Sequence, residues 1–265
     1  MSGAKDELLR LAGVDYDYGT RRVLCGANFR LRVGERVALV GSNGAGKTTL
    51  MHVLVGLKRP QAGDVIAFGR TCRDEADFLS VRAQVGLLFQ NSDDQLFCPT
   101  VLDDVAFGPL NLGRSVADAR GDAEQALADL GLEAFAERVT HQLSAGEKRM
   151  VALATVLAMR PRVLLLDEPT NGLDRISEER LIAHLGTLDQ AMVIVSHDRH
   201  LLGQLSNRAL VLKDGRLNEA VLHRHPHVHR HEHLHLHVPD QVAPVLYGAG
   251  PTEPVPEHSD HHAAE

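Results

Sequence analysis

The stretch Gly41-Ser42-Asn43-Gly44-Ala45-Gly46-Lys47-Thr48 decides how the rest of the sequence is interpreted. It follows the apolar run 37–40 and precedes a segment of helical character over residues 47–55. Its spacing matches G-x-x-x-x-G-K-[ST], in which the glycines let the backbone curl so that successive N–H groups point at phosphate oxygens. The positive end of the following helix adds to this attraction. The stretch therefore predicts a phosphate-binding loop between a strand and a helix.

Each polar residue of this loop has an expected task. Lys47 is expected to reach the β- and γ-phosphates of a nucleotide, and the Thr48 hydroxyl to bind Mg²⁺. The alternative is a glycine-rich turn that binds nothing, which the position between a strand and a helix disfavours. The residues expected to contact the nucleotide here are Gly41, Ser42, Asn43, Gly44, Ala45, Gly46, Lys47, Thr48 and Thr49.

Two further apolar runs end at polar residues in the same way. Residues 163–166 stop at Asp167-Glu168, and residues 192–195 stop at Ser196-His197. Continuous apolar runs are typical of strands covered on both faces, as in parallel sheets. Ligands bind at the carboxyl edge of such sheets.

Helical segments alternate with these runs, over residues 117–130, 145–159 and 177–188. The alternation predicts a doubly wound α/β fold. Residues 16–18 and 29–33 instead alternate between apolar and polar, which is typical of antiparallel, half-exposed strands.

The carboxylates after the second apolar run are candidates for catalysis. Asp167 is expected to hold the Mg²⁺ shell, and Glu168, pointing to the opposite side, to polarise an attacking water. Two adjacent acids at a strand end could also form an ordinary acidic turn. Their place beside a phosphate loop favours the catalytic interpretation.

Composition bounds the remaining possibilities. The chain has 265 residues and a net charge of −7, which argues against a nucleic-acid protein with a basic face. Its three cysteines are widely spaced and indicate no disulfide framework. The first ten residues do not resemble a secretory signal, and no apolar run is long enough to span a bilayer. We expect a globular domain over residues 1–222 and a largely flexible tail over residues 223–265.

The segment Leu143-Ser144-Ala145-Gly146-Glu147 precedes a helix and makes a family resemblance specific. Together with the phosphate loop and V-L-L-L-D-E-P-T, it resembles the ATP-binding cassette (ABC) ATPases over residues 8–222. Their signature is usually L-S-G-G-Q, from which Ala145 and Glu147 depart. The resemblance implies an ATP-hydrolysing P-loop fold with a mainly parallel sheet, an N-terminal antiparallel β subdomain and an inserted helical subdomain at about 91–160.

Further site residues are implied by the resemblance. Tyr18 matches the aromatic residue that stacks on adenine, although Tyr16 is a rival. Gln90 matches the residue that touches Mg²⁺ and the attacking water, and His197 the histidine that contacts the γ-phosphate. The implied catalytic set is Glu168, His197 and Gln90, and the implied Mg²⁺ set is Thr48, Gln90 and Asp167.

The resemblance also implies a dimer. Ser144, Gly146 and Asp174 would contact ATP held by the phosphate loop of a second subunit, so that one chain lacks a complete site. A homodimer is favoured over a heterodimer.

Residues 90–113 narrow the resemblance. The string Q-N-S-D-D-Q-L-F-C-P-T-V-L-D-D-V-A-F-G-P-L-N-L-G is similar to the same region of energy-coupling-factor importer ATPases, with Ser92 in place of a proline. This implies membrane subunits as partners, no nucleic acid, and a peripheral place at the cytoplasmic face of the membrane. Alternatively, Leu96, Phe97, Val101 and Phe107 belong to an ordinary core.

Histidine is the abundant residue of the tail. Eleven of the 16 histidines fall in the last 43 residues. Such a run predicts binding of Ni²⁺, Co²⁺ or Zn²⁺, against the alternatives of a pH-sensitive solvated tail or a purification tag. Every second residue is a histidine at His223, His225, His227, His229, His231, His233, His235 and His237, and His258, His261 and His262 follow.

The resemblance and the tail together predict the ATPase subunit of a cobalt or nickel importer, with nickel slightly favoured. The alternative is an energy-coupling-factor ATPase for a vitamin or another small substrate. A soluble mechanical ATPase is disfavoured, because no sustained heptads lie between the loop and the signature.

Overall fold

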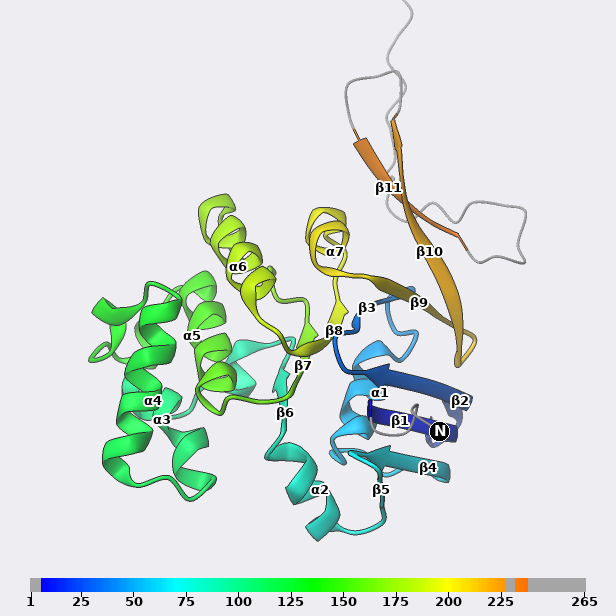
Figure 1. The fold of residues 1–265 in the computed structure, drawn as a ribbon, viewed down its shortest axis with the longest axis horizontal. Coiled ribbons are helices and arrows are strands. Elements are labelled where there is room, and N and C mark those ends of the chain that lie inside the picture. Colours follow the sequence, from blue (N-terminus) through cyan, green and yellow to red (C-terminus); the bar gives the residue numbers. More distant parts are fainter. Residues whose placement is uncertain (1–5, 227–231, 238–265) are drawn as a thin grey trace, which may run out of the picture.

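The structure, a computed structural model, describes residues 6–226 and 232–237, with side chains described through residue 221. Two β-sheets and seven α-helices make up this described part (Figure 1). Several predicted tail positions lie outside the described residues, namely His227, His229, His231, His258, His261 and His262.

The larger sheet has seven strands in the described ranges. They are β3 (Arg36–Val40), β6 (Val85–Leu88), β7 (Val163–Asp167), β8 (Ala191–Val195), β9 (Arg208–Lys213), β10 (Arg216–Pro226) and β11 (Glu232–His237). Their order is β11-β10-β9-β3-β8-β7-β6. The five strands from β9 to β6 are parallel, and β10 and β11 add antiparallel at one edge. The predicted parallel core is confirmed.

The smaller sheet is antiparallel. Its strands are β1 (Glu7–Tyr18), β2 (Arg21–Arg32), β4 (Ala62–Ala67) and β5 (Arg70–Cys72), in the order β2-β1-β4-β5. Alternating burial in β2 gives the strand one buried face, as the alternation over residues 29–33 predicted.

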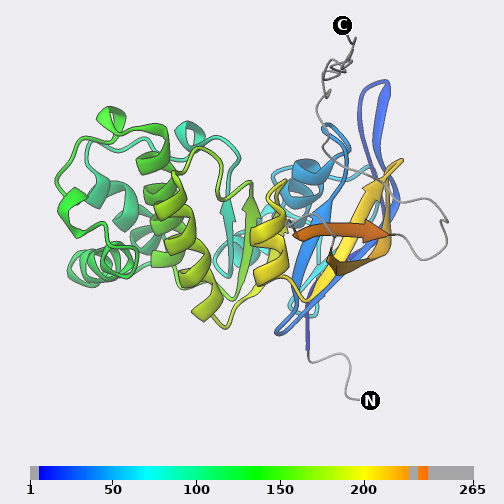
Figure 2. The same ribbon diagram turned by 90° about the horizontal axis from the view of Figure 1, so that it is seen from above.

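The described residues form seven α-helices. They are α1 (Lys47–Leu54), α2 (Glu75–Arg82), α3 (Val101–Asn111), α4 (Val116–Asp129), α5 (Ala145–Ala158), α6 (Arg175–Thr187) and α7 (Arg199–Leu205). Three short 3₁₀ turns, Ser92–Asp94, Glu133–Phe135 and Thr140–Gln142, connect them. The helices α3, α4 and α5 pack together at the end of the molecule opposite the smaller sheet, as Figures 1 and 2 both show. The inserted helical subdomain of the expected fold is therefore present.

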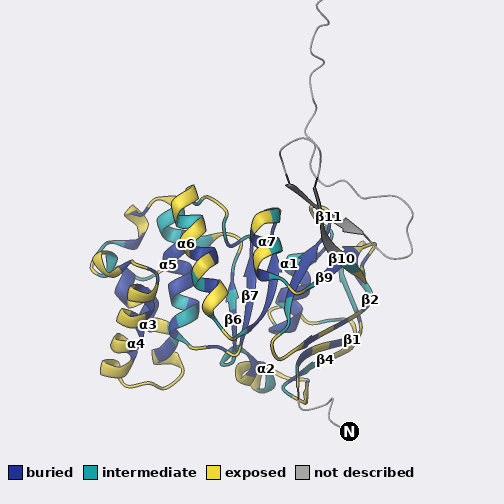
Figure 3. Ribbon diagram, turned by 45° about the horizontal axis from the view of Figure 1, so that its top comes forward, coloured by how far each residue is buried: buried dark blue, intermediate teal, exposed yellow. Residues whose placement is uncertain are grey.

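The larger sheet separates two hydrophobic clusters. Leu164 and Leu166 of β7 pack in a cluster with α5, α6 and α7, whereas Val163 and Leu165 pack with α1 and the smaller sheet. Because successive side chains of a strand point to opposite faces, a strand covered on both sides must be apolar throughout. All five residues of β7 and of β8 are accordingly buried, and Figure 3 shows these strands among the buried elements.

The chain continues in regular structure past the expected end of the domain. The boundary at 222/223 falls inside β10, and β10 pairs with β9 along one half and with β11 along the other. Among the described helices, none combines the length and the apolar character needed to cross a bilayer.

Candidate nucleotide site

A cavity of about 540 Å³ opens at the carboxyl edge of the parallel strands. Eleven of its lining residues were predicted from the sequence, and four others were not: Arg21, Val23, Asn171 and Val195. The predicted residues that line it are Tyr18, Asn43, Gly44, Gly46, Lys47, Thr48, Thr49, Gln90, Asp167, Glu168 and His197. The cavity therefore collects side chains from several elements that lie far apart in the sequence.

The phosphate loop connects β3 to α1, as the sequence predicted. Gly46 is the N-cap of α1 with φ 107°, and a Cβ there would lie 2.4 Å from Val23 Cγ1. Only glycine fits both this backbone conformation and this contact. No side chain caps the helix, so its first N–H groups remain available to an anion.

Lys47 spans the loop. Its Nζ donates to the backbone oxygens of Gly41 at 2.8 Å and of Ser42 at 3.1 Å. Burial lowers the pKa of Lys47, and the nearby charges of Glu168 and Asp167 oppose this effect. Outside the loop, Arg21 donates to the Gly44 oxygen at 2.7 Å and holds the loop from β2.

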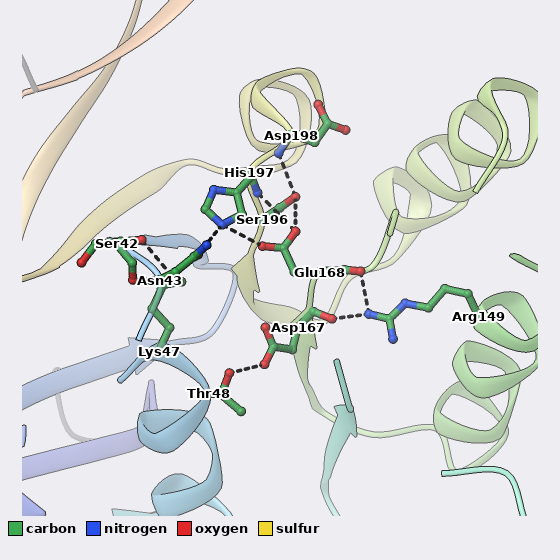
Figure 4. Close-up of polar contacts among 11 residues, drawn as sticks. Ser42, Asn43, Lys47, Thr48, Arg149, Asp167, Glu168, Ser196, His197 and Asp198 are labelled. Carbon is green, nitrogen blue, oxygen red and sulfur yellow. Dashed lines mark hydrogen bonds and ion pairs between the residues drawn. The ribbon is translucent and has the colours of Figure 1, made fainter. Parts of the chain in front are cut away.

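Asp167, the last residue of β7, contacts the start of α1. The Thr48 hydroxyl donates to Asp167 Oδ2 at 2.6 Å (Figure 4). Burial raises the pKa of Asp167, which is 2% exposed, while the hydrogen bond from Thr48 and the charge of Arg149 oppose the shift. A carboxylate and a hydroxyl, with the Gln90 amide lining the same cavity, form an all-oxygen donor set that fits Mg²⁺.

Glu168 turns away from its neighbour toward β8. Its φ of 50° is unusual for a residue with a side chain. Glu168 Oε2 accepts from the Ser196 hydroxyl and from the His197 N–H, both at 3.3 Å. His197 Nε2 lies 3.6 Å from Glu168 Oε1 and 3.1 Å from Asn43 Oδ1 (Figure 4). The ends of β7 and β8 are thus joined to the phosphate loop.

The two tyrosines of β1 differ in their surroundings. Tyr18 is 50% exposed and lines the cavity, and its hydroxyl lies 3.2 Å from Thr49 Oγ1. Tyr16 does not line the cavity and packs against the hydrophobic cluster around α1. The geometry therefore favours Tyr18 as the residue available to a nucleotide base.

Arg149 is a residue whose importance the sequence did not indicate. It lies in α5, is 2% exposed, and is surrounded by backbone oxygens. Burial lowers its pKa to about 10. Its guanidinium donates to the oxygens of Phe89, of Gln90 at 3.4 Å, of Asp167, of Glu168 at 2.6 Å and of Pro169 at 3.3 Å. One side chain thus connects the signature helix to the segments that follow β6 and β7.

The predicted partner-side residues lie elsewhere. None of Ser144, Gly146 and Asp174 lines the cavity. Ser144 caps α5 and accepts from the Glu147 N–H at 3.3 Å, while Glu147 Oε2 accepts from the Ser144 N–H at 2.7 Å. Asp174 caps α6. Within one chain, these residues do not meet the phosphate loop.

Glu147, a departure from the usual signature, carries a compensated charge. Arg138 Nη1 lies 2.6 Å from Glu147 Oε1. The hydrogen bond from the Ser144 N–H, assisted by Arg138, lowers the pKa of Glu147 to about 2. The start of α5 therefore holds a carboxylate that is ionised at neutral pH.

Comparison with known proteins decides the family. Residues 24–171 match the ABC transporter family. The chain belongs to the ABC transporter ATPases. A putative ABC transporter ATP-binding protein of Brucella suis is 55% identical over 218 residues, which cover 82% of this chain and 91% of that protein. The predicted ABC fold and the assignment as an ATP hydrolase are confirmed.

More specific names occur among other relatives of this ABC ATPase. The cobalt import ATP-binding protein CbiO of Rhodobacter capsulatus is 48% identical over 188 residues, covering 69% of this chain and 67% of that protein. The energy-coupling factor transporter ATP-binding protein EcfA of Methanothermobacter thermautotrophicus is 42% identical over 216 residues, covering 79% and 69%.

Solved structures share the fold. CbiO1 of Clostridium perfringens, described as part of the ABC transporter complex cbiONQ, matches with a TM-score of 0.70 and 32% identity, covering 80% of this chain and 87% of that one. The ATP-binding cassette MJ0796, in a dimeric post-hydrolysis state bound to ADP and Pi, matches with a TM-score of 0.73 and 27% identity, covering 80% and 98%.

Proposed function

We propose that this ABC ATPase powers an energy-coupling-factor importer for divalent cobalt or nickel, as a dimer bound to membrane subunits. The observation that carries the dimeric mechanism is the separation of two half-sites on one chain. The cavity holds Lys47, Asp167 and Glu168, whereas Ser144 and Gly146 lie outside it. A second copy supplies the missing half.

In the proposed site, the loop of residues 41–49 holds the phosphates of ATP, and Tyr18 stacks on adenine. Thr48, Gln90 and Asp167 would hold Mg²⁺, which would neutralise charge on the phosphates. Glu168 polarises the attacking water, because it is the cavity carboxylate that Thr48 does not engage. His197 Nε2 lies 3.6 Å from Glu168 Oε1, and we assign its imidazole to contact with the γ-phosphate.

The proposed dimer closes over ATP. The N-terminus of α5, with Ser144 and Gly146, approaches the γ-phosphate held by the partner's phosphate loop, and Asp174 comes near from the same side. The dipole of α5 favours the triphosphate, and cleavage removes part of the charge that keeps the dimer closed. Because each chain carries both half-sites, we propose a homodimer.

A paired aromatic surface on the helical subdomain supports a membrane partner. Phe97 and Phe107 are 64% and 43% exposed, and their ring centroids lie 4.8 Å apart at an edge-to-face angle of 89°. Leu96 and Val101 of the same stretch are buried. Leu96 and Val101 are therefore core residues. The exposed Phe97 and Phe107 remain available to a helix of a membrane subunit at the cytoplasmic face.

Two lines of support favour cobalt or nickel as the cargo. One relative is named a cobalt import protein, and a structural neighbour is described as part of a cbiONQ complex. The tail is rich in histidine, whose imidazole nitrogen binds Ni²⁺, Co²⁺ and Zn²⁺. The second candidate is a vitamin importer, because the relatives named only as energy-coupling-factor proteins carry no substrate in their names.

The dimer is tested with Glu168→Gln. We expect hydrolysis to fall about 10²-fold or more, because the general base is lost. Sedimentation velocity should then show a dimer with Mg·ATP and a monomer without nucleotide. Lys47→Ala is the control that should stay monomeric, and a monomeric Glu168→Gln chain at saturating Mg·ATP contradicts the proposal.

The cargo is tested by uptake in cells that carry either the wild-type chain or Glu168→Gln. Radioactive Co²⁺ and Ni²⁺ uptake should require the active chain, and uptake of a labelled vitamin such as biotin should not. The opposite pattern replaces the metal importer by the vitamin importer. Co-purification should recover membrane subunits with the wild-type chain, and their consistent absence counts against the transporter role.

A further inference from the structure

The outer edge of the larger sheet is a two-stranded ribbon that the ATP site does not use. Residues 216–220 of β10 pair with β9, and residues 221–226 pair with β11. Figure 1 shows this ribbon projecting from the sheet on the side of β9, and α7 contacts β11. The ribbon is therefore attached to the body of the ATPase at a defined place.

The register of the ribbon aligns the histidines. His223 lies opposite His235, His225 opposite His233, and His237 opposite Val221. Directly opposed residues of an antiparallel pair share a face, and so do alternate residues along each strand. These five histidine positions consequently belong to one face. The other face holds Leu222, Arg224, Leu234 and Leu236.

This alignment depends on register and not on composition. A slip of one residue in either strand would move the histidines of that strand to the face opposite those of the other. Opposed positions in an antiparallel pair have Cβ atoms about 4.5–5.5 Å apart, a spacing that one metal ion can bridge with two imidazoles. Two neighbouring pairs bring four histidine positions together, which equals the number of ligands in a closed tetrahedral site.

We propose that this face of the ribbon, where the register places His223, His225, His233 and His235, is a transition-metal site for Ni²⁺, Co²⁺ or Zn²⁺. The preference for Ni²⁺ or Co²⁺ rests on the proposed function, whereas the site itself rests on the register. Imidazole suits all three ions. An isolated two-stranded ribbon is marginally stable in water, so a metal that joins both strands also stabilises the ribbon.

The test exchanges residues within β11 while it keeps the composition and the number of histidines. The exchange consists of the four substitutions His233→Leu, Leu234→His, His235→Leu and Leu236→His. The full-length protein is titrated with Ni²⁺, and separately with Zn²⁺, in competition with a chromophoric chelator. The matched control removes histidines outside the ribbon, with His258→Gln, His261→Gln and His262→Gln.

If the ribbon is the site, the exchange weakens the tightest Ni²⁺ binding by about tenfold or more, since two imidazoles leave the shared face. The control variant should stay within about twofold of the wild type. Equal affinity of the wild type and the exchange variant overturns the site, because it shows that composition alone binds the metal. Absence of Ni²⁺ and Zn²⁺ binding to the wild type overturns it as well.

The same variants separate this inference from the proposed function. The ATPase rate of the exchange variant should equal that of the wild type, since the ribbon lies outside the nucleotide cavity. Metal binding at the ribbon combined with vitamin uptake contradicts the proposed cargo and leaves the site standing. Metal uptake combined with an unchanged affinity in the exchange variant contradicts the site and leaves the cargo standing.

Discussion

The N-termini of α1 and α5 are built in opposite ways. At α1, glycine occupies the N-cap and no side chain accepts from the first N–H groups. At α5, Ser144 and Glu147 cap each other, and Arg138 compensates the added carboxylate. One helix start is left for a ligand to complete, whereas the other is satisfied by its own chain.

The two helix starts differ in how far their proposed part in the ATP site depends on a partner chain. The α1 end offers free N–H groups, Lys47 and the Mg²⁺ donor set within one cavity, so one chain is equipped to bind Mg·ATP. In the proposed dimer, the capped start of α5 contributes the remainder of its helix dipole to the triphosphate bound by the partner. Loss of the first end should abolish binding, and loss of the second should abolish closure.

The largest effect is expected when the starts of α1 and α5 are inactivated in separate chains and the two variants are then mixed. Lys47→Ala damages the α1 end, and Ser144→Arg damages the exposed start of α5. Each variant alone should have almost no ATPase activity. Mixed in equal amounts, they should regain up to about a quarter of the wild-type rate, because half of randomly formed dimers contain one intact composite site.

The rate of the mixture is measured against each variant at the same total concentration. A mixture as inactive as its components would contradict the division of the ATP site between the α1 end of one chain and the α5 end of another. So would full activity of the Ser144→Arg chain by itself, because the α5 end would then play no part in hydrolysis.

The next effect concerns the residue that joins the α5 helix to the cavity. Arg149→Ala leaves several buried backbone oxygens without a donor and should lower the free energy of unfolding by at least about 3 kcal/mol. For a chain of this size, the midpoint of thermal unfolding should fall by about 6 °C or more. Arg120→Ala, which breaks an exposed pair with Glu124, should cost less than about 0.5 kcal/mol.

A purely structural role is separated from a positioning role by kinetics. Arg149 does not line the cavity, yet it holds the backbone of Gln90 and Glu168. Below the unfolding temperature, Arg149→Ala should therefore lower kcat more than it raises KM, and Arg149→Lys should recover part of kcat. An unchanged kcat would leave Arg149 with a structural role only.

A smaller effect on KM for ATP is expected at Tyr18, which lines the same cavity as the start of α1. Tyr18→Ala should raise KM for ATP between about fivefold and about a hundredfold, the range that base–aromatic stacking implies. Tyr18→Phe should keep most of the affinity, because the ring remains. Tyr16→Ala is the matched variant from the same strand and should leave KM nearly unchanged; the reverse result would assign the stacking to Tyr16.

The smallest effect concerns the acidic cap of α5. The folded state lowers the pKa of Glu147 from 4.5 to about 2, so it stabilises the protein above pH 4.5 and loses this contribution as pH falls toward 2. Glu147→Gln should lower the unfolding midpoint at pH 7, and its difference from the wild type should shrink between pH 5 and pH 3. A difference that stays constant over this interval would mean that the charge of Glu147 does not stabilise the cap.

The sequence predicted the elements whose local pattern is strong. The runs 163–166 and 192–195 lie within β7 and β8, and the helix expected over residues 145–159 is α5, Ala145–Ala158. These predictions succeeded because burial on both faces leaves an uninterrupted apolar run. The antiparallel edge of the larger sheet could not be predicted, because the pairing of β10 with β11 depends on the register between two segments that both contain histidine at every second residue.

The candidate site was predictable where a motif fixes the residue and not where packing does. Lys47 follows from the phosphate-loop motif, and Asp167 and Glu168 from their place at a strand end; the structure brings all three to one cavity. Arg149 looks like an ordinary helix-surface arginine in the sequence, because nothing local shows that its guanidinium is enclosed by backbone oxygens. The choice between Tyr16 and Tyr18 likewise needed the strand to be placed against the cavity.

Because the larger sheet divides the interior into two hydrophobic clusters, adjacent leucines of β7 pack in different surroundings. Leu164 belongs to the cluster on the side of α5, and Leu165 to the cluster on the side of α1. Isotopically labelled methyl groups at these two positions would therefore act as independent spectroscopic reporters, one for each half of the molecule. A nucleotide that perturbs the Leu165 resonance first and the Leu164 resonance only on association would reveal the order of events from within a single strand.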